Sequence, residues 1–286
     1  MILVTGAAGF IGQSLVDHLG AQGVICADPA DSNMLTPEEA MRRLEHTDDI
    51  TMVYHMGAIS STTETNMLAL TENNVAYSLK LLYLCLDKDI PLVYASSASV
   101  YGAATGTQRE DQAHAPINGY AISKSTFDNF ARQIISLYPD AKVYGLRYFN
   151  VYGHHEHHKG NMASPVHKFT MQARDTGKIQ IFEGSEKYLR DFINIEDVVK
   201  ITIEASNLAQ AGVYNVGTGV ARSFLDVAKI IAAETGAEIQ EIPFPNHLKG
   251  RYQTHTCSDN TKIADNGYTH PRLDLETGIK NTLALI

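Results

Sequence analysis

The chain has 286 residues, of which 44% are hydrophobic and 19% are charged, so it can bury a sizeable core and global disorder is excluded. Its 23 basic and 32 acidic side chains give a formal net charge of −9, which argues against general affinity for nucleic acid or anionic membranes. The three cysteines are widely spaced, which is typical of reduced thiols in a cytoplasmic protein. The sequence opens on an apolar strand in place of a leader and has no apolar run of about 18 residues, so neither secretion nor a membrane span is expected.

Short apolar runs alternate with amphipathic stretches through the first half of the chain. Strands are expected at 2–4, 24–27, 51–54, 91–95 and 142–146, and helices at 10–20, 37–46, 67–87 and 120–138. This alternation predicts an α/β fold with a doubly wound parallel (Rossmann) sheet covered by helices on both faces. Only one helix fits between residue 28 and the strand at 51–54, so the third strand of the usual order is expected to be missing or vestigial.

The pattern changes after Arg147. Residues 151–190 mix glycine, histidine and lysine with polar residues, and a strand at 213–216 and a helix at 224–235 follow. We therefore expect a dinucleotide-binding domain over residues 1–150, with segments near 191–220 returning to it. A smaller C-terminal substrate-binding lobe is expected from residues 151–190 and 221–286.

A glycine-rich turn follows the first strand and opens the first helix. Glycines at this position allow a tight turn and a close backbone approach to a pyrophosphate, which the helix N-terminus attracts. The alternative is a purely structural turn, but the place of the motif in the first βα unit favours dinucleotide binding. The predicted phosphate-binding residues are Gly6, Gly9 and Gly12.

Asp28 ends the second strand. A carboxylate there accepts hydrogen bonds from a ribose 2′-hydroxyl and repels a 2′-phosphate. Residues 29–37 contain no lysine or arginine, so NAD is favoured over NADP. The alternative for Asp28 is that it only caps a turn.

A candidate catalytic group follows the fourth expected strand. That strand ends in a serine-rich segment containing Ser97, and Tyr120 and Lys124 are spaced to share one helix face. A nearby ammonium and an oxidised nicotinamide both favour phenolate, so they lower the pKa of the tyrosine toward that of a useful base. The serine can bind the same substrate oxygen. The alternative is a surface helix pair, but the order of the motifs predicts oxidation of an alcohol with hydride transfer.

This motif set resembles the extended short-chain dehydrogenase/reductase superfamily over nearly the whole chain, including segments 146–153, 190–192 and 215–219. Three further segments, 55–64, 158–164 and 242–253, together with 182–186, resemble the ADP-L-glycero-D-manno-heptose 6-epimerase family. The resemblance implies that the C6 hydroxyl of a nucleotide-linked heptose is oxidised by a bound dinucleotide and reduced again from the other face. The product would feed heptose-containing glycans such as the lipopolysaccharide inner core.

The resemblance also implies residue roles. Tyr120 and Lys159 match the two acid–base groups, and Lys124 matches the lysine that binds the nicotinamide ribose; the alternative for Lys159 is a diphosphate-binding or solvated lysine. Further cofactor positions are Phe10, Ile11, Gly57, Ala58 and Asn73. The substrate positions are Ser60, Asn150, Val151, Asn161, His167, Phe182, Glu183, Gly184, Ser185, Arg190, Arg251 and Tyr252, with Arg190 the candidate for the diphosphate.

Five features depart from that family, among them the absence of a basic residue after Asp28, Asn161 where serine is usual, and the shortened segment around the third strand. Met56 stands where glutamate is usual, and residues 154–159 read His-His-Glu-His-His-Lys in place of Pro-Arg-Glu-Gly-His-Lys. Closely spaced imidazoles can share a metal, but the implied mechanism needs none, so no metal is predicted.

Two other functions remain open at this point, a nucleotide-sugar 4-epimerase or related oxidoreductase, and a non-catalytic regulator that binds a dinucleotide. The expected partners are a nucleotide-diphosphate sugar and further copies of this chain. The expected helices at 67–87 and 120–138 occupy positions that often form the dimer face in this superfamily, and Leu81, Leu84, Phe127 and Phe130 lie beyond one core stripe. The alternative is that these side chains are simply core.

Overall fold

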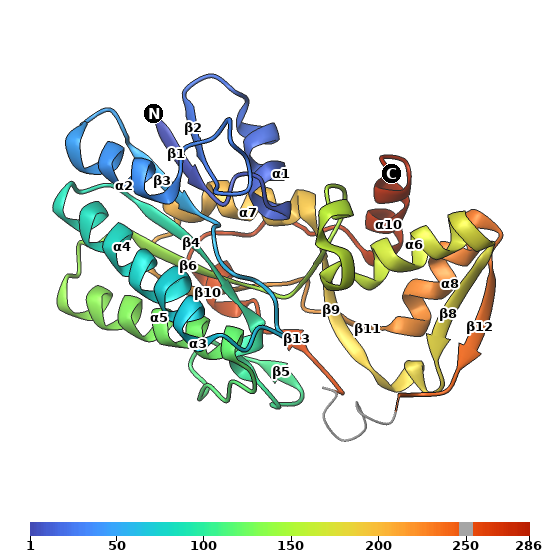
Figure 1. Ribbon diagram of the computed structural model, residues 1–286. Coiled ribbons are helices and arrows are strands. Elements are labelled where there is room, and N and C mark those ends of the chain that lie inside the picture. The colour runs from blue at the N-terminus through green and yellow to red at the C-terminus, as the bar shows by residue number, and fades with distance from the viewer. Residues whose placement is uncertain (246–253) are drawn as a thin grey trace.

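The computed structural model describes residues 1–245 and 254–286. Its largest element is a six-stranded sheet in the order β10-β6-β4-β3-β1-β2 (Figure 1). The strands are β1 (Ile2–Thr5), β2 (Val24–Ala27), β3 (Met52–His55), β4 (Leu92–Ser97), β6 (Val143–Tyr148) and β10 (Gly212–Val216). All neighbours are parallel, so the carboxyl ends of the strands meet at one edge. The expected doubly wound parallel sheet is confirmed.

Strand β2 is the edge of the sheet, and the third strand of the usual order would pair with its outer side. In its place Leu35 makes a single parallel bridge to Ala27. The Leu35 amide donates to the Cys26 carbonyl over 3.0 Å, and the Asp28 amide donates to the Leu35 carbonyl over 2.9 Å. Helix α2 (Pro37–His46) begins two residues later, capped by Thr36. The third strand is vestigial, as the short spacing predicted.

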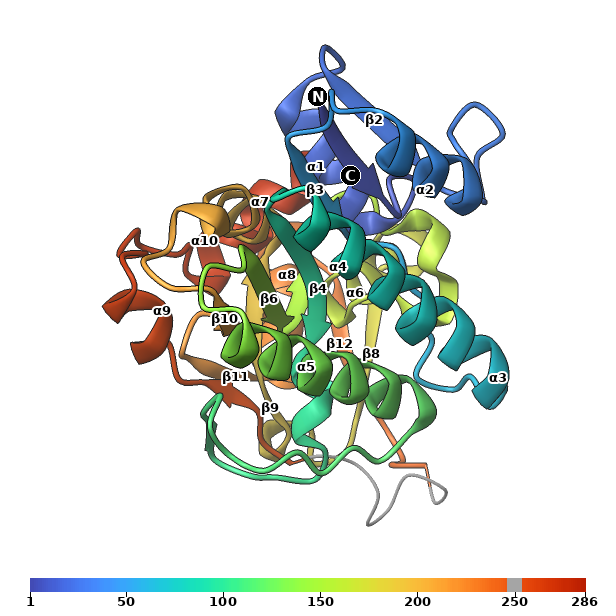
Figure 2. The same cartoon turned by 90° about the vertical axis from the view of Figure 1, so that its left-hand side faces the viewer.

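Helices cover both faces of this sheet. Helices α1 (Phe10–Leu19) and α7 (Ile195–Glu204) pack in one core, and α2, α4 (Tyr77–Asp87) and α5 (Gly119–Leu137) pack in the other (Figure 2). Leu3 and Val4 of β1 point into opposite cores, as the alternation of a strand requires. Within the described ranges, no helix has the length and apolarity that a bilayer span needs.

The helix expected at 67–87 is continuous but not uniform. Helix α3 (Met67–Leu70) runs through a π-helical segment (Thr71–Ala76) into α4. A π-turn shifts the side chains that follow it around the helix axis, and such turns often lie at functional sites. This segment contains both Asn73 and Asn74.

A smaller lobe stands beside the large sheet (Figure 1). It contains a three-stranded sheet of β7 (Asn150–Tyr152), β9 (Leu189–Asn194) and β11 (Ala221–Ser223), and a parallel pair of β8 (Lys178–Phe182) and β12 (Glu238–Ile242). Helices α6 (Pro165–Thr176), α8 (Phe224–Thr235) and α10 (Leu275–Leu283) enclose a separate core that includes Val166, Val227 and Ile279.

The chain returns to the large sheet later than expected. Strand β13 (Cys257–Ser258) pairs with β5 (Thr107–Gln108), and helix α9 (Thr261–Asp265) follows. Ile263 and Tyr268 are buried in the core on the α1–α7 face of the large sheet. Residues 257–268, which the sequence assigned to the smaller lobe, therefore pack on the dinucleotide-binding unit.

Candidate active site

The loops after β1 and β3 touch at the carboxyl edge of the sheet. Gly6 has φ +69°, and a Cβ there would collide with the backbone of Gly57. A Cβ at Gly12 would collide with the Gly6 carbonyl, because the first turn of α1 lies directly against the loop. Side chains at these positions would force the two loops apart, so the glycines are needed for the close approach.

The N-terminus of α1 is open to an anion. Gly9 is its N-cap and has no side chain to bind the first amides, and the first turn, which starts with Phe10 and Ile11, carries no acidic residue. Unpaired amides and the positive end of the helix dipole suit a phosphate. The residues present therefore fit the pyrophosphate of a dinucleotide, with Gly57 and Ala58 on the facing loop.

Asp28 stands beside this phosphate loop. Its Oδ2 accepts a hydrogen bond from the Ala8 amide over 3.2 Å, and its Oδ1 accepts one from the Ala30 amide over 2.9 Å. Asp28 thus caps a turn and ties the phosphate loop to the end of β2. A carboxylate oxygen has a second lone pair, so these bonds are compatible with a ribose hydroxyl.

The buried ring of His55 is hydrogen bonded to a side chain that contacts both the loop after β1 and the loop after β3. Its Nδ1 lies 2.6 Å from Thr5 Oγ1, and its Nε2 lies 2.7 Å from Ser78 Oγ. Burial, with the Lys124 charge adding to it, lowers the pKa of His55 to about 3, so the ring is neutral at physiological pH. Thr5 Oγ1 also accepts from the Gly57 amide over 3.4 Å, which joins both loops to the imidazole.

Asn74, not Asn73, reaches the β3 loop. The Asn74 Oδ1 accepts from the Ile59 amide over 2.8 Å, and its Nδ2 donates to the Ile59 carbonyl over 2.9 Å and to Ser123 Oγ over 2.9 Å. Asn73 is exposed, and its Nδ2 donates to the Ala69 carbonyl of its own helix. Asn73 stays a predicted cofactor position, and Asn74, which was not predicted, connects the β3 loop to the helix that carries Tyr120.

Tyr120, Ser97 and Lys124 come together as predicted from the motifs. Tyr120 lies in the first turn of α5, and the Ser97 hydroxyl at the end of β4 is placed to lower the pKa of its phenol. The Lys124 ammonium is 6.0 Å from the centre of the Tyr120 ring and donates to the Ala95 carbonyl over 2.7 Å. Lys124 is 7% exposed, so its charge is held in the interior.

Burial dominates the electrostatics of this group. It raises the pKa of Tyr120, although the Ser97 hydrogen bond opposes the shift, and it lowers the pKa of Lys124 to about 8. The residues of this chain by themselves do not lower the tyrosine pKa as expected, because the effect of desolvating the phenolate is larger than the opposing effect of Ser97. The positive nicotinamide of an oxidised dinucleotide is the contribution that remains to offset it.

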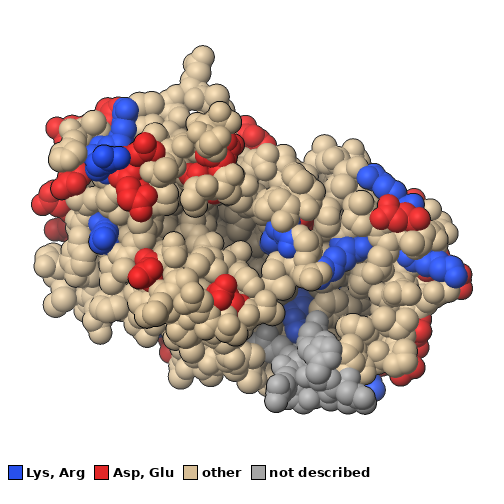
Figure 3. Space-filling model, viewed as in Figure 1, with Lys and Arg blue, Asp and Glu red and all other residues tan. Residues whose placement is uncertain are grey.

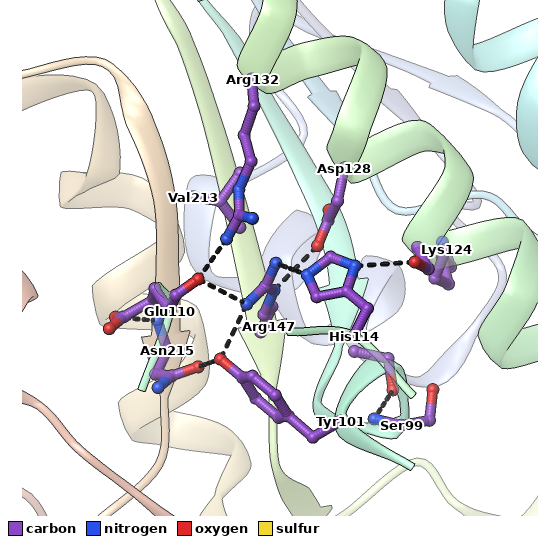
Figure 4. Close-up of polar contacts among 12 residues, drawn as sticks. Ser99, Tyr101, Glu110, His114, Lys124, Asp128, Arg132, Arg147, Val213 and Asn215 are labelled. Atoms are coloured by element: carbon purple, nitrogen blue, oxygen red, sulfur yellow. Dashed lines mark hydrogen bonds and ion pairs between the residues drawn. The ribbon is translucent and has the colours of Figure 1, made fainter. Parts of the chain in front are cut away.

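A buried ion pair stands one turn beyond Lys124 (Figure 4). Asp128 and Arg147 are both fully buried, and Arg147 Nε donates to Asp128 Oδ2 over 2.8 Å. The Tyr94 hydroxyl donates to Asp128 Oδ1 over 3.0 Å, and Arg147 Nη1 donates to the Tyr101 hydroxyl over 2.8 Å. The sequence analysis missed this pair. Its signal is a lone arginine inside an apolar central strand, where an unpaired charge is not tolerated.

His114 completes the network on the α5 side (Figure 4). Its Nε2 bonds to Arg147 Nη2, and its Nδ1 bonds to Ser125 Oγ over 2.7 Å. Burial and the Arg147 charge lower the pKa of His114 to about 4, so its Nε2 accepts from the guanidinium and its Nδ1–H donates to the serine. Because Ser125 adjoins Lys124, the network fixes the helix turn that carries the lysine.

Lys159 approaches the site from the smaller lobe. It lies on a short 3-10 helix (His157–Met162), and its ammonium is 4.8 Å from the centre of the Phe10 ring at the start of α1. Burial lowers the pKa of Lys159; the charge of Lys168 adds to this and that of Glu156 opposes it. A partly desolvated lysine beside the phosphate loop can exchange a proton more readily than a solvated one.

Arg190 and an aromatic cluster line the smaller lobe. Arg190 is 7% exposed, lies 5.6 Å from the centre of the Phe224 ring and donates to the Leu189 carbonyl over 2.8 Å. Phe244 packs edge-on against Phe182 and stacks on Tyr188. Figure 3 shows a hollow between the two lobes, with lysine and arginine side chains gathered on its smaller-lobe side.

The other predicted substrate positions lie on this lobe, apart from Ser60, which follows β3 of the large sheet. Asn150 and Val151 begin β7, and Ser60 is exposed in the loop after β3. The Asn161 carbonyl accepts from Lys168 Nζ over 2.8 Å. The turn after β8 contains Glu183, whose amide donates to the Ile242 carbonyl, Gly184 at φ +77°, and buried Ser185. Arg251 and Tyr252 lie outside the described residues.

His167 faces a histidine-rich cavity. This cavity of about 560 Å³ is lined by His154, His155, His157, His167 and Glu196, among others. The His167 Nδ1 is buried without a hydrogen-bond partner. In the part of the chain that the structure describes, no group of three or more His, Cys, Asp or Glu side chains is arranged to hold a metal ion.

Comparisons with known proteins cover the whole chain. Residues 2–217 match the sequence profile described as "NAD dependent epimerase/dehydratase family". The chain is 39% identical to the ADP-L-glycero-D-manno-heptose-6-epimerase of Alkalilimnicola ehrlichii, over 99% of this chain and 96% of that protein. The crystal structure of the Helicobacter pylori ADP-L-glycero-D-manno-heptose-6-epimerase is 31% identical with a TM-score of 0.86, covering 99% and 95% of the two chains. The UDP-glucose 4-epimerase of Thermus thermophilus, solved in complex with NAD, is 25% identical with a TM-score of 0.81, over 99% and 97%.

Proposed function

The chain belongs to the NAD dependent epimerase/dehydratase family, and from that premise we propose that it inverts C6 of an ADP-linked heptose. The reaction converts ADP-D-glycero-D-manno-heptose into ADP-L-glycero-D-manno-heptose. The observation that carries an epimerisation is the presence of two candidate proton carriers on different lobes, Tyr120 beside Ser97 and Lys159 beside Phe10. The identity of the sugar rests on the full-length likeness to heptose epimerases.

Tyr120 accepts the proton of the C6 hydroxyl, and the Ser97 hydroxyl stabilises the oxygen as its charge develops. Lys124 holds a positive charge behind the phenol and is the proposed ligand of the nicotinamide ribose. The dinucleotide that the phosphate loop and Lys124 would hold would supply a hydride acceptor for C6 and then a hydride donor, so none would be consumed. Lys159 supplies the proton when the carbonyl is reduced from its other face, because each epimer needs its own proton carrier. Exchange with solvent then removes the proton held by Tyr120 and restores the one given by Lys159. Arg190 is the proposed partner of the substrate diphosphate.

A proton NMR time course in D₂O tests the proposal. The purified protein is mixed with ADP-D-glycero-D-manno-heptose, and the L-glycero epimer is expected to appear with hydrogen, not deuterium, at C6. The Tyr120→Phe variant is expected to lose at least a hundredfold in turnover and to keep its dinucleotide. The matched control is Tyr138→Phe, since Tyr138 is exposed at the other end of the same helix. No conversion with NAD or NADP added would refute the heptose assignment.

Two other functions have different outcomes in the same experiments. A nucleotide-sugar 4-epimerase would leave the heptose unchanged and act on a UDP-sugar, and the fold likeness to the Thermus thermophilus UDP-glucose 4-epimerase favours it as the second candidate. A non-catalytic dinucleotide-binding regulator would show no turnover, and its dinucleotide affinity would be the same in the Tyr120→Phe variant.

We also infer that copies of this chain associate through α3, α4 and α5. The sequence analysis named Leu81 and Phe127 for this face, but both are buried core residues, and Leu84 is half-buried. Phe130 is 41% exposed, and the other exposed apolar side chains on these helices include Leu68, Tyr83, Ile122 and Leu137. Light scattering after gel filtration tests this, and Phe130→Asp is expected to weaken the association. A cytoplasmic location is likewise a proposal, supported by three free thiols.

A further inference from the structure

The histidine-rich segment between β7 and α6 spans from the smaller lobe to the phosphate loop. It contains His154, His155, His157 and His158, none of which the proposed reaction uses, and it carries Lys159. Two parts of the dinucleotide-binding unit contact it, helix α1 and the loop after β3. The contacts that hold it there decide where Lys159 stands.

Glu156 anchors the segment to the smaller lobe. Its side chain is fully buried. One carboxylate oxygen accepts from the Gly153 amide over 3.1 Å and from the Ser164 hydroxyl over 2.7 Å, and the other accepts from the Ser164 amide. Ser164 is in turn the N-cap of α6. The two ends of the segment are thereby fixed to each other, so it moves as one piece.

His155 ties the same segment to the other lobe. Its Nε2 is 2.8 Å from Asp17 Oδ2 on α1. The backbone of His155 has φ +66°, a left-handed conformation that residues other than glycine adopt at a cost in conformational energy. The contact with Asp17 offsets this cost. Further along, the Lys159 ammonium covers the Phe10 ring and the Thr62 hydroxyl lies 3.8 Å from Met162 Sδ. The segment thus closes over the start of α1.

The charges around His155 come from three elements. Asp17 stands on α1, and Glu196 at the start of α7 lies 3.9 Å from His154 Nδ1. On its own segment, His154 and His158 are close enough for their charges to interact with His155. Burial and the neighbouring cations lower the pKa of His158, and the Asp28 carboxylate opposes this shift.

We propose that residues 154–159 form a strap across the dinucleotide site, held closed by the His155–Asp17 contact, and that the strap retains the dinucleotide between the two hydride transfers. Loss of the reduced dinucleotide at that point would leave an oxidised sugar that cannot be reduced again. The purpose of the strap rests on the proposed function, whereas its existence rests on the contacts above. His155 is accordingly a positioning residue.

The test is the rate at which NADH dissociates from the full-length protein, followed by NADH fluorescence in stopped flow. In His155→Asn the new residue tolerates positive φ, but its side chain is too short to reach Asp17. In Asp17→Asn the side chain keeps the shape of aspartate and loses its negative charge. Each is expected to speed dissociation two- to fivefold, as for an exposed ion pair, and the double variant is expected to equal either single one. The control is His46→Asn, because His46 is an exposed histidine beside Glu45 on α2.

A variant that keeps the charge separates a strap from a merely structural contact. His155→Arg keeps a cation that can pair with Asp17, so NADH is expected to leave this variant as slowly as it leaves the unaltered protein. Thermal melts of each variant check that the fold is retained.

Equal dissociation rates in His155→Asn, Asp17→Asn and the His46→Asn control would overturn the strap, as would a failure to bind NADH at all. These outcomes are independent of the sugar. If the variants release NADH faster and no heptose is converted, the proposed function fails and the strap stands. If the heptose is converted and the rates are unchanged, the strap alone fails.

Discussion

Removal of one partner of the ion pair between Arg147 and Asp128 is expected to be among the most destabilising single changes in this chain. Both side chains are fully buried, and Arg147 also donates to Tyr101, His114 and the Glu110 carbonyl. Arg147→Met removes every one of these donors. Asp128 then keeps only the Tyr94 hydroxyl, and a buried carboxylate with one partner costs about 3–5 kcal/mol.

Urea denaturation followed by circular dichroism measures this loss at a fixed protein concentration, because association also affects stability. The control is Arg43→Met. The Arg43–Asp49 pair is 39% and 40% exposed, so its loss is expected to cost less than about 1 kcal/mol. In the double variant Arg147→Met/Asp128→Leu, part of the stability is expected to return, since no unpaired charge remains. A loss below about 1 kcal/mol in Arg147→Met would refute the reasoning.

Three further predictions follow from the site. Gly12→Ala is expected to reduce dinucleotide affinity at least tenfold in a fluorescence titration, because its Cβ would collide with the Gly6 carbonyl; an unchanged affinity would contradict the close packing of α1 on the loop. Asp28→Ser is expected to shift the ratio of NAD to NADP affinity toward NADP by roughly tenfold, because it removes the charge that repels a 2′-phosphate; a constant ratio would mean that Asp28 acts only as a cap. Lys124→Met is expected to abolish turnover and to stabilise the fold by about 3 kcal/mol at pH 7. Burial lowers the Lys124 pKa from 10.5 to about 8, so the folded state carries the free-energy cost of the charge, and the methionine removes it. The unfolded chain binds more protons between pH 8 and 10.5, so this gain is present below pH 8 and disappears as the pH rises to 10.5; a gain that persists in urea denaturation above pH 10.5 would contradict it.

Local patterns in the sequence predicted the elements that carry the chemistry. The strand at 24–27 and the helices at 37–46 and 224–235 have the predicted bounds. A buried strand appears in the sequence as a short apolar run, and a helix buried on one side appears as apolar residues that repeat every three or four positions. The turn at Gly6, the Tyr120–Lys124 spacing and the vestigial third strand were also readable. Each depends on residues close together in the chain, where the backbone geometry alone fixes the relation between side chains.

Only the tertiary structure decided which distant residues meet. Arg147 and Asp128 belong to different elements. A lone arginine in an apolar strand indicates that a buried partner is needed, but nothing in the sequence identifies Asp128 as that partner. Asn74 rather than Asn73 reaches the β3 loop, because neighbouring side chains on a helix point in different directions and the π-turn changes the phase.

The same holds for the two lobes. Residues 257–268 return to the large sheet, and the segment of Lys159 closes on α1, through contacts between residues more than a hundred positions apart. An amphipathic pattern indicates that one face of an element is buried, but which other element packs on that face depends on the packing of the whole chain.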